Sequence, residues 1–257
     1  MSQNIRVAVL GLGEAGSHFA NDLVAFGVNV SGYDPEPKKG LHPDIRIVAT
    51  NAEAARDADI ILSVNMASVA VEVANDVLPV LKKRQIFADM NTASPWTKIE
   101  VASVLAKTEA QVVDVAIMAP VPLKGINSPF LASGPGAVAF FEMLRPLKLN
   151  INVLNDKVGD AATHKLLRSI VYKGFAAVIG EAINASQAMG LEQYMRAQIS
   201  SLIGGNDELI NRFLEGSKTH ALRRSHELEA VVSMLLNHQV EPVMSRATLK
   251  SLQNLID

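Results

Sequence analysis

The hydrophobic pattern divides the chain into two parts. Over the first 157 residues, short unbroken apolar runs alternate with longer segments in which apolar residues recur at helical intervals. The runs are typical of strands buried on both faces, and the longer segments are typical of amphipathic helices. Strands are expected at residues 5–10, 28–34, 45–49, 59–65, 85–91, 110–122 and 151–155, with a further short strand between 123 and 147. This alternation predicts an α/β fold with a doubly wound Rossmann sheet.

The pattern changes near Gly159. From there strand-like runs stop, and helical periodicity continues to the C-terminus. Short breaks are expected near Gly190, residues 204–207 and Gly216. We therefore predict a Rossmann dinucleotide-binding domain at residues 1–157 and an all-helical domain at residues 158–257. The apolar helices after Gly159 are more than one covering layer can bury, which favours a homodimer.

A glycine-rich loop follows the first strand. Gly11, Gly13 and Gly16 have the spacing G-x-G-x-x-G, and a helical segment that stops at Gly27 follows them. In a dinucleotide site, the first glycine allows the turn, the second admits the pyrophosphate and the third lets the helix pack on the strand. The candidate cofactor-binding residues of the loop are Gly11, Leu12, Gly13, Glu14, Ala15 and Gly16. The alternative is an ordinary strand–helix turn without a nucleotide.

An acidic residue ends the second expected strand. Asp34 lies 23 positions after Gly11, where a carboxylate would accept hydrogen bonds from the adenosine ribose. Pro35 stands where NADP-selective sites often place an arginine. The cofactor is therefore expected to be NAD rather than NADP, although Lys38 and Lys39 are near enough in sequence to weaken this preference.

Polar residues follow two further strands. Val64, Asn65 and Met66 end one strand, and Asn91 and Thr92 end the next, so both groups are expected at the carboxyl edge of the sheet beside the nicotinamide. Ser94 comes directly before Pro95, which is expected to be the first residue of a helix. Ser94 is a candidate substrate contact. For both Thr92 and Ser94, the alternative is a helix cap.

Residues 159–190 can form one long, largely apolar helix. On it Lys165, Ser169, Tyr172 and Lys173 make a single polar stripe. A lysine that is partly desolvated in a cleft suits acid/base chemistry, so Lys165 is the candidate catalytic residue. The alternative is that both lysines extend from an amphipathic helix to solvent.

Composition narrows the class of function. The net charge of −2 gives no overall attraction to nucleic acid or anionic membranes, and the absence of cysteine excludes disulfides and thiolate chemistry. The six histidines form no dense cluster with metal-ligand spacing, so no metal site is expected. No apolar run approaches the roughly 18 residues of a membrane span, and the N-terminus opens directly into a strand with no room for a signal peptide. We expect a cytoplasmic protein that binds neither nucleic acid nor membranes.

Four segments, taken in order, resemble the β-hydroxyacid dehydrogenase superfamily, which includes 6-phosphogluconate and 3-hydroxyisobutyrate dehydrogenases. They are GLGEAG, DMNTASP, VDVAIMAPV and GDAATHK. The stretches KLLRSIVYKGFAAV and THALRRSHELEAV resemble a branch of short relatives with a reduced helical C-terminal domain. The resemblance implies a Rossmann domain, a helical domain for substrate binding and dimerisation, and oxidation of 3-hydroxy acids or reduction of the corresponding carbonyl compounds.

The resemblance also implies roles for single residues. The family's catalytic lysine follows G-x-G-x-x-x-K, which places it at Lys165, with Ala161 in place of the second glycine. The substrate-orienting asparagine four residues later is replaced by Ser169, and Lys173 is a candidate to supply a missing anion contact. The family's Ser-Gly-Gly substrate loop is replaced by Met118, Ala119 and Pro120. These departures put the usual small hydroxy acid in doubt and favour a bulkier or less polar substrate.

A second charged cluster lies in the helical part. His220, Arg223, Arg224 and Glu227 share one helix face and could hold an anion in a partner's cleft. The alternative, which we favour, is a solvated, salt-bridged helix face.

The leading hypothesis is an NAD(P)-dependent oxidoreductase acting on an anionic small molecule, a hydroxy acid or related alcohol. An imine-reductase-like enzyme of the same superfamily is a second hypothesis, although a cationic lysine beside an iminium is unfavourable. A non-catalytic protein that senses the dinucleotide is a third.

Overall fold

The computed structural model describes residues 5–256, which form two compact units divided after Lys165. This division falls inside the long helix α7 (Asp160–Ala188), whereas the sequence placed it after residue 157. The reason is that the first turn of α7 is hydrogen-bonded to the sheet, since Asp114 and Ser133 accept N–H groups from its first residues. The first unit therefore contains the start of α7 as well as the sheet.

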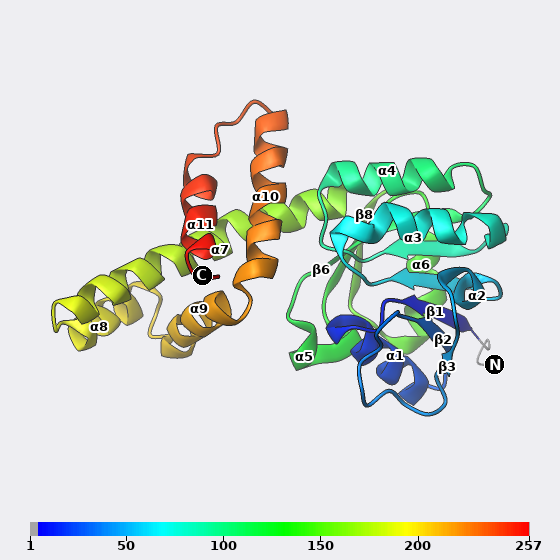
Figure 1. Ribbon diagram of the computed structural model, residues 1–257, viewed down its shortest axis with the longest axis horizontal. Helices are drawn as coiled ribbons and strands as arrows, with labels where there is room; N and C mark the ends of the chain where they lie inside the picture. The colour runs from blue at the N-terminus through cyan, green and yellow to red at the C-terminus, as the bar shows by residue number, and fades with distance from the viewer. Residues whose placement is uncertain (1–4, 257) are drawn as a thin grey trace. The chain divides into compact units, whose positions relative to one another are not determined.

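The first unit contains one eight-stranded sheet in the order β3-β2-β1-β4-β5-β6-β7-β8 (Figure 1). Its strands are β1 (Arg6–Leu10), β2 (Asn29–Tyr33), β3 (Arg46–Ile47), β4 (Ile60–Ser63), β5 (Ile86–Asp89), β6 (Gln111–Ile117), β7 (Phe130–Ser133) and β8 (Ile151–Asn155). All neighbours pair in parallel except β6 and β7. The chain order reverses between β1 and β4, which creates the switch point at which α/β sheets bind ligands. The predicted α/β fold is confirmed.

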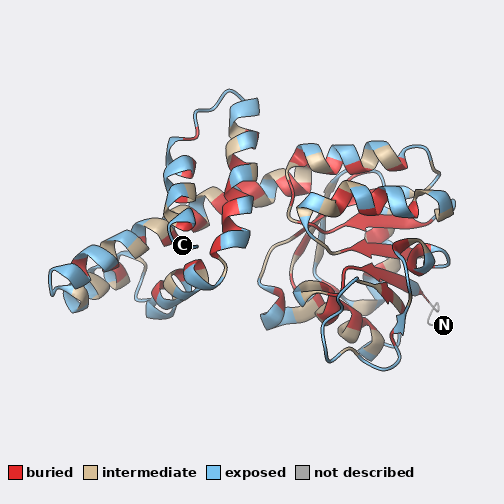
Figure 2. Ribbon diagram, in the orientation of Figure 1, coloured by how far each residue is buried: buried red, intermediate tan, exposed pale blue. Residues whose placement is uncertain are grey.

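Helices cover both faces of the sheet because successive side chains of each strand point to opposite faces. The helices of this unit are α1 (Glu14–Ala25), α2 (Asn51–Ala55), α3 (Ala70–Val77), α4 (Pro95–Leu105), α5 (Val121–Lys124) and α6 (Ala137–Leu144). In β1, Val7 and Val9 pack with α1 and α6, whereas Ala8 and Leu10 pack with α2, α3 and α4. Figure 2 shows the resulting buried sheet between more exposed helices.

One expected strand is shorter than predicted. The apolar run 110–122 predicts a strand throughout, but β6 ends at Ile117. Pro120 and Pro122 lack the N–H groups that a ladder requires, so the chain turns into α5 instead.

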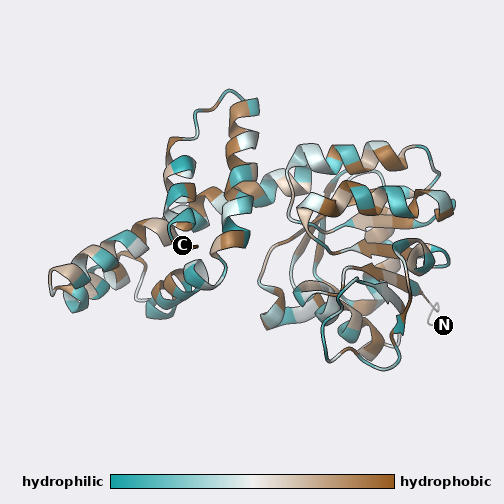
Figure 3. Cartoon of the chain, in the orientation of Figure 1, coloured by the Kyte–Doolittle hydropathy of each residue, from teal (hydrophilic) through white to brown (hydrophobic). Residues whose placement is uncertain are grey.

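The second unit is helical, as predicted. After the greater part of α7 come α8 (Glu192–Leu202), α9 (Asp207–Thr219), α10 (Ala221–Asn237) and α11 (Val243–Gln253). Apolar residues of α7, α8 and α9 form one buried cluster, and residues of α7, α10 and α11 form another. Figure 3 shows that brown apolar positions alternate with teal polar ones along these helices.

The break expected near Gly216 is wrong. Gly216 lies inside α9, and the chain breaks at His220 instead. A Cβ at Gly216 would lie 2.6 Å from Nη2 of Arg224. The glycine at position 216 therefore leaves room for the side chain of Arg224 from the next helix, α10. It does not end helix α9.

Candidate active site

The loop between β1 and α1 has the tight geometry that its glycines predict. Gly11 has a φ of +100°, and its N–H donates to Tyr33 O at 2.8 Å. A Cβ at Gly11 would lie 2.3 Å from Val64 O, and one at Gly16 would lie 1.8 Å from Gly11 O. The fold itself requires both glycines, because strand, loop and helix pack too closely for a side chain.

Gly13 differs from the other two glycines. Its φ is −68°, which any residue adopts, and no atom of the described chain lies within 4 Å of where its Cβ would be. It is the N-cap of α1, whose first turn begins with Glu14 and Ala15 and has no side-chain cap. The fold does not require glycine here. An open backbone surface at a helix N-terminus fits the pyrophosphate of a dinucleotide.

Asp34 connects the end of β2 to this loop. Its Oδ2 accepts the N–H of Leu12 at 2.7 Å, and its Oδ1 accepts the N–H of Glu36 at 2.8 Å. Each carboxylate oxygen has a further lone pair, which is what the hydroxyls of an adenosine ribose require. The geometry therefore fits the ribose-binding role predicted for Asp34.

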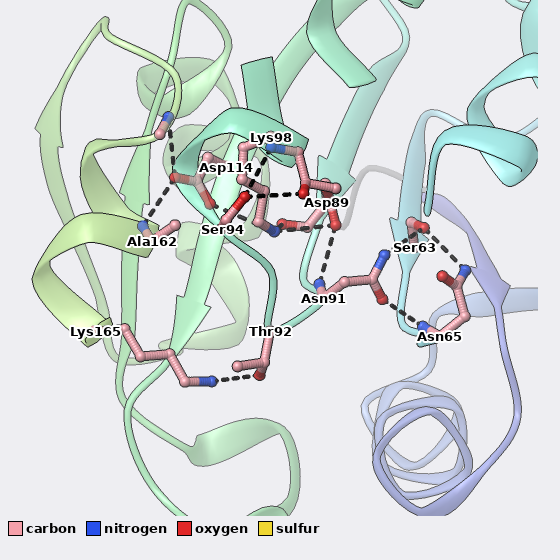
Figure 4. Close-up of polar contacts among 12 residues, drawn as sticks. Ser63, Asn65, Asp89, Asn91, Thr92, Ser94, Lys98, Asp114, Ala162 and Lys165 are labelled. Atoms are coloured by element: carbon pink, nitrogen blue, oxygen red, sulfur yellow. Dashed lines mark hydrogen bonds and ion pairs between the residues drawn. The ribbon is translucent and has the colours of Figure 1, made fainter. Parts of the chain in front are cut away.

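The turns that follow β4 and β5 lie at the same edge of the sheet and are bonded to each other (Figure 4). The N–H of Asn65 donates to Asn91 Oδ1 at 2.6 Å, and Asn65 Nδ2 donates to Ser63 Oγ at 3.1 Å. Asn65 Oδ1 is buried and has no hydrogen-bond partner within the described residues. This amide oxygen is an acceptor that a bound ligand could use.

Lys165 reaches the same turns. Its Nζ donates to Thr92 Oγ1 at 2.7 Å (Figure 4), and the lysine is half-buried. Thr92 Oγ1 is therefore a partner of the candidate catalytic lysine. Ser94 is a helix cap, because its Oγ accepts the N–H of Thr97 at 3.2 Å at the start of α4. Substrate binding by Ser94 stays a prediction.

The predicted substrate-binding segment Met118, Ala119 and Pro120 follows β6. The N–H of Met118 donates to Pro129 O at 2.8 Å, which extends the hydrogen-bond ladder between β6 and β7. Pro120 directly precedes α5. Two apolar side chains near the same edge of the sheet are well exposed, Met66 at 68% and Leu123 at 73%. With Ala119 between Met118 and Pro120, this edge presents apolar surface. Substrate binding by these three residues stays a prediction.

Sequence reasoning missed a buried charged cluster directly behind these turns. Lys98 Nζ lies 3.0 Å from Asp89 Oδ1 and 3.5 Å from Asp114 Oδ1, and all three side chains are at most 2% exposed. Lys98 belongs to α4, between the exposed residues Trp96 and Ile99. A lysine in an amphipathic helix is ordinarily solvated, so the sequence carried no signal for this burial.

Burial raises the pKa of Asp114, although Lys98 and the N–H of Ala162 oppose the shift and Asp89 adds to it. The folded protein therefore holds this proton more tightly than the unfolded chain does. The contribution of Asp114 to the free energy of unfolding is complete below the pKa that Asp114 has in the unfolded chain. It is lost as the pH rises through the pKa that Asp114 has in the folded protein. Asp114→Asn has no such titration. We expect the Tm of this variant, relative to wild type, to rise in thermal denaturation as the pH is increased above about 4, the ordinary pKa of an aspartate. A constant difference would contradict the raised pKa.

Ser169 and Lys173 belong to the helical unit. Lys173 Nζ donates to Glu227 Oε2 at 2.7 Å and to Ser169 Oγ at 2.9 Å, and all three residues are buried. Burial lowers the pKa of Lys173, and Glu227 opposes the shift. A substrate anion would have to displace this ion pair, so the substrate-binding roles of both residues stay predictions.

The charged face of α10 is salt-bridged, as expected, but it is not solvated throughout. Arg223 Nη1 donates to Glu227 Oε1 at 2.7 Å. Arg224 is buried, donates to Ser217 Oγ at 2.9 Å and lies 5.8 Å from the centre of the Tyr172 ring. The expectation of a solvated face is therefore wrong for Arg224 and Glu227, because α9 and α7 pack against them.

Across residues 5–256, no three side chains of His, Cys, Asp or Glu are placed to hold a metal ion. No helix in this described range is long and apolar enough to cross a membrane.

Comparisons with known proteins assign families to both parts of the chain. Residues 6–121 match the NAD binding domain of 6-phosphogluconate dehydrogenase, and residues 186–255 match a domain of unknown function. An uncharacterized 28.5 kDa protein of Methanothermus fervidus is 27% identical over 95% of this chain and 96% of its own length. The mitochondrial 3-hydroxyisobutyrate dehydrogenase of Rattus norvegicus is 25% identical over 80% of this chain, and the match spans 64% of that enzyme.

Solved structures agree with this assignment. A conserved protein of unknown function, described as structurally similar to 3-hydroxyacid dehydrogenases, has a TM-score of 0.76 at 28% identity over 98% of this chain and 96% of its own. An imine reductase from Pseudomonas sp. shares the fold, with a TM-score of 0.65 at 21% identity over 98% and 93% of the two chains. The chain belongs to the superfamily of 6-phosphogluconate dehydrogenase-like and 3-hydroxyisobutyrate dehydrogenase-like proteins, with an NAD(P)-binding N-terminal domain.

Proposed function

We propose that this chain is an NAD(P)-dependent oxidoreductase that interconverts a hydroxy acid, or a related alcohol, and its carbonyl counterpart, with Lys165 as general acid/base. The contact between Lys165 Nζ and Thr92 Oγ1, 2.7 Å long, carries the proposal. It places an amine at the carboxyl edge of the sheet, where the glycine loop and the turns after β4 and β5 also lie. A bound nicotinamide supplies the hydride acceptor or donor, and Lys165 takes up or returns the hydroxyl proton.

We infer a preference for NAD over NADP. The carboxylate of Asp34 lies beside the glycine loop, where it can accept the two ribose hydroxyls and would repel a 2′-phosphate. Lys38 also lies near the loop, since its N–H donates to Leu12 O at 3.1 Å. The side chains of Lys38 and Lys39 are the groups that could offset this repulsion.

The substrate is proposed to be a small anion that is less polar around its reacting carbon than the family norm. This follows from the apolar segment Met118, Ala119 and Pro120, which replaces the hydroxyl and N–H donors of the family loop. In its cationic form, Lys165 would favour a carbonyl over an iminium at the reacting carbon, because like charges repel. An imine-reductase-like reaction requires this lysine to be neutral.

The proposal is tested by thermal-shift titration with NAD, NADH, NADP and NADPH, followed by turnover assays with 3-hydroxy acids of increasing apolar size. A ligand that binds only the folded state at about 100 times its Kd stabilises it by near 3 kcal/mol, which is readily measured. A shift with no dinucleotide would contradict the proposal. A shift without turnover of any alcohol or carbonyl would favour the dinucleotide-sensing alternative.

We further propose a homodimer formed through the helical unit. Leu167, Val171, Phe175 and Val178 recur at helical spacing along α7, and their exposed fractions lie between 49% and 59%. An apolar stripe of this kind on one helix is typical of an interface between chains. Phe175→Glu is expected to convert the dimer into a monomer in sedimentation experiments, because the dimer would bury the carboxylate without a partner. The exposed change Lys218→Glu is the control, and a wild-type monomer would contradict the proposal.

A further inference from the structure

The buried cluster of Lys98, Asp89 and Asp114 lies between the two segments that carry Thr92 and Lys165 (Figure 4). One positive charge and two carboxylates are withdrawn almost entirely from solvent. Buried ion pairs often contribute no more stability than well-packed apolar side chains of the same volume. A contribution to stability alone therefore does not explain why these three charged side chains are buried together.

One arm of the cluster fixes the turn that carries Thr92. Lys98 Nζ donates to Asp89 O at 2.7 Å and lies 3.0 Å from Asp89 Oδ1. The same Oδ1 accepts the N–H of Asn91 at 3.0 Å, one residue before Thr92. Lys98 thus contacts both the main-chain carbonyl and the side-chain carboxyl group of Asp89, the last residue of β5 before this turn.

The other arm fixes the start of the helix that carries Lys165. Asp114 Oδ1 lies 3.5 Å from Lys98 Nζ. Asp114 Oδ2 accepts the N–H of Gly159 at 3.1 Å and that of Ala162 at 3.0 Å. Ala162 is three residues before Lys165, so this carboxyl group caps the helix within one turn of the lysine.

We propose that Lys98 is a positioning residue that sets the contact between Lys165 and Thr92. It connects the end of β5 to the start of α7 through two carboxyl groups, and its own side chain is only 1% exposed. The inference rests on the proposed function of Lys165, because its consequence for catalysis requires that lysine to act on the substrate. A displacement of about 1 Å of a catalytic group lowers turnover by about a hundredfold.

The test begins with Lys98→Met, which keeps the length of the side chain and removes its charge. We expect kcat to fall by about a hundredfold with little change in the Kd for the dinucleotide, since the cluster's hydrogen bonds go to the end of β5 and the start of α7. A second readout does not need activity. The pH dependence of chemical labelling of the Lys165 amine, followed by peptide mass spectrometry, is expected to change midpoint in the variant.

A double variant separates position from stability. Lys98→Met leaves two buried carboxylates without their cation, which lowers stability, whereas Lys98→Met with Asp89→Asn removes one of these charges and keeps an oxygen for the N–H of Asn91. We expect the double variant to recover stability without recovering kcat or the wild-type labelling midpoint. If Lys98→Met does not fold, the same measurements on the double variant decide the test.

The matched control is Leu105→Ala, a fully buried position on the same helix α4 that lies outside the cluster. It is expected to lower stability and to keep the wild-type labelling midpoint. A folded double variant with wild-type kcat and labelling would overturn the positioning role. Failure of the proposed function is distinguishable, because Lys165→Ala would then keep its activity whatever Lys98 does.

Discussion

Replacing Lys165 by alanine is expected to lower kcat by about a hundredfold to ten-thousandfold, the contribution typical of a general acid/base. Dinucleotide affinity should change little, because the amine bonds Thr92 Oγ1 and the glycine loop is formed by other residues. Steady-state turnover with the best substrate of the screen measures the first quantity. Thermal-shift titration with the preferred dinucleotide measures the second.

Lys157→Ala is the matched control for this substitution. Lys157 lies shortly before α7, its side chain is 75% exposed, and it forms an ion pair with the nearby Asp160. Its removal should leave kcat unchanged. Wild-type turnover in Lys165→Ala would contradict the proposed mechanism. A wild-type protein that binds dinucleotide but turns over nothing would favour the sensing alternative.

The substitution Gly13→Ala is expected to weaken dinucleotide binding by at least about tenfold, or about 1.4 kcal/mol, while the protein stays folded. No described atom lies within 4 Å of the added Cβ, so the fold can accept it, at a loss of about 1 kcal/mol for the poorer N-cap. A bound pyrophosphate would meet this methyl group because it approaches the backbone there. The Kd from a fluorescence titration with NADH measures the effect.

Two further glycines provide matched comparisons. Gly174 in α7 also has no described atom within 4 Å of an added Cβ, so Gly174→Ala should leave the Kd unchanged. Gly16→Ala should instead destabilise the fold by about 3 kcal/mol, because its Cβ would overlap Gly11 O. An unchanged Kd in folded Gly13→Ala would show that the open surface at Gly13 is not where the cofactor binds.

Local spacing in the sequence determined the elements of the fold and the groups at their ends. The apolar runs predicted strands, and the order of strand, glycines, helix and Asp34 predicted the loop that Asp34 contacts through Leu12. Parallel strands bring their carboxyl ends to one edge, so Thr92 could be expected near the glycine loop. These features depend on residues close together in the sequence or on strand direction alone.

Only the tertiary structure decided which charged groups are buried together. Lys98 and Asp114 are 16 positions apart in the sequence, and Lys173 and Glu227 are 54 apart, yet both pairs meet away from solvent. A sequence pattern places a lysine on a helix, but it does not say which element from another part of the chain packs over that lysine. The burial of Lys98, the pairing of Lys173 and the room that Gly216 leaves for Arg224 all depend on such long-range packing.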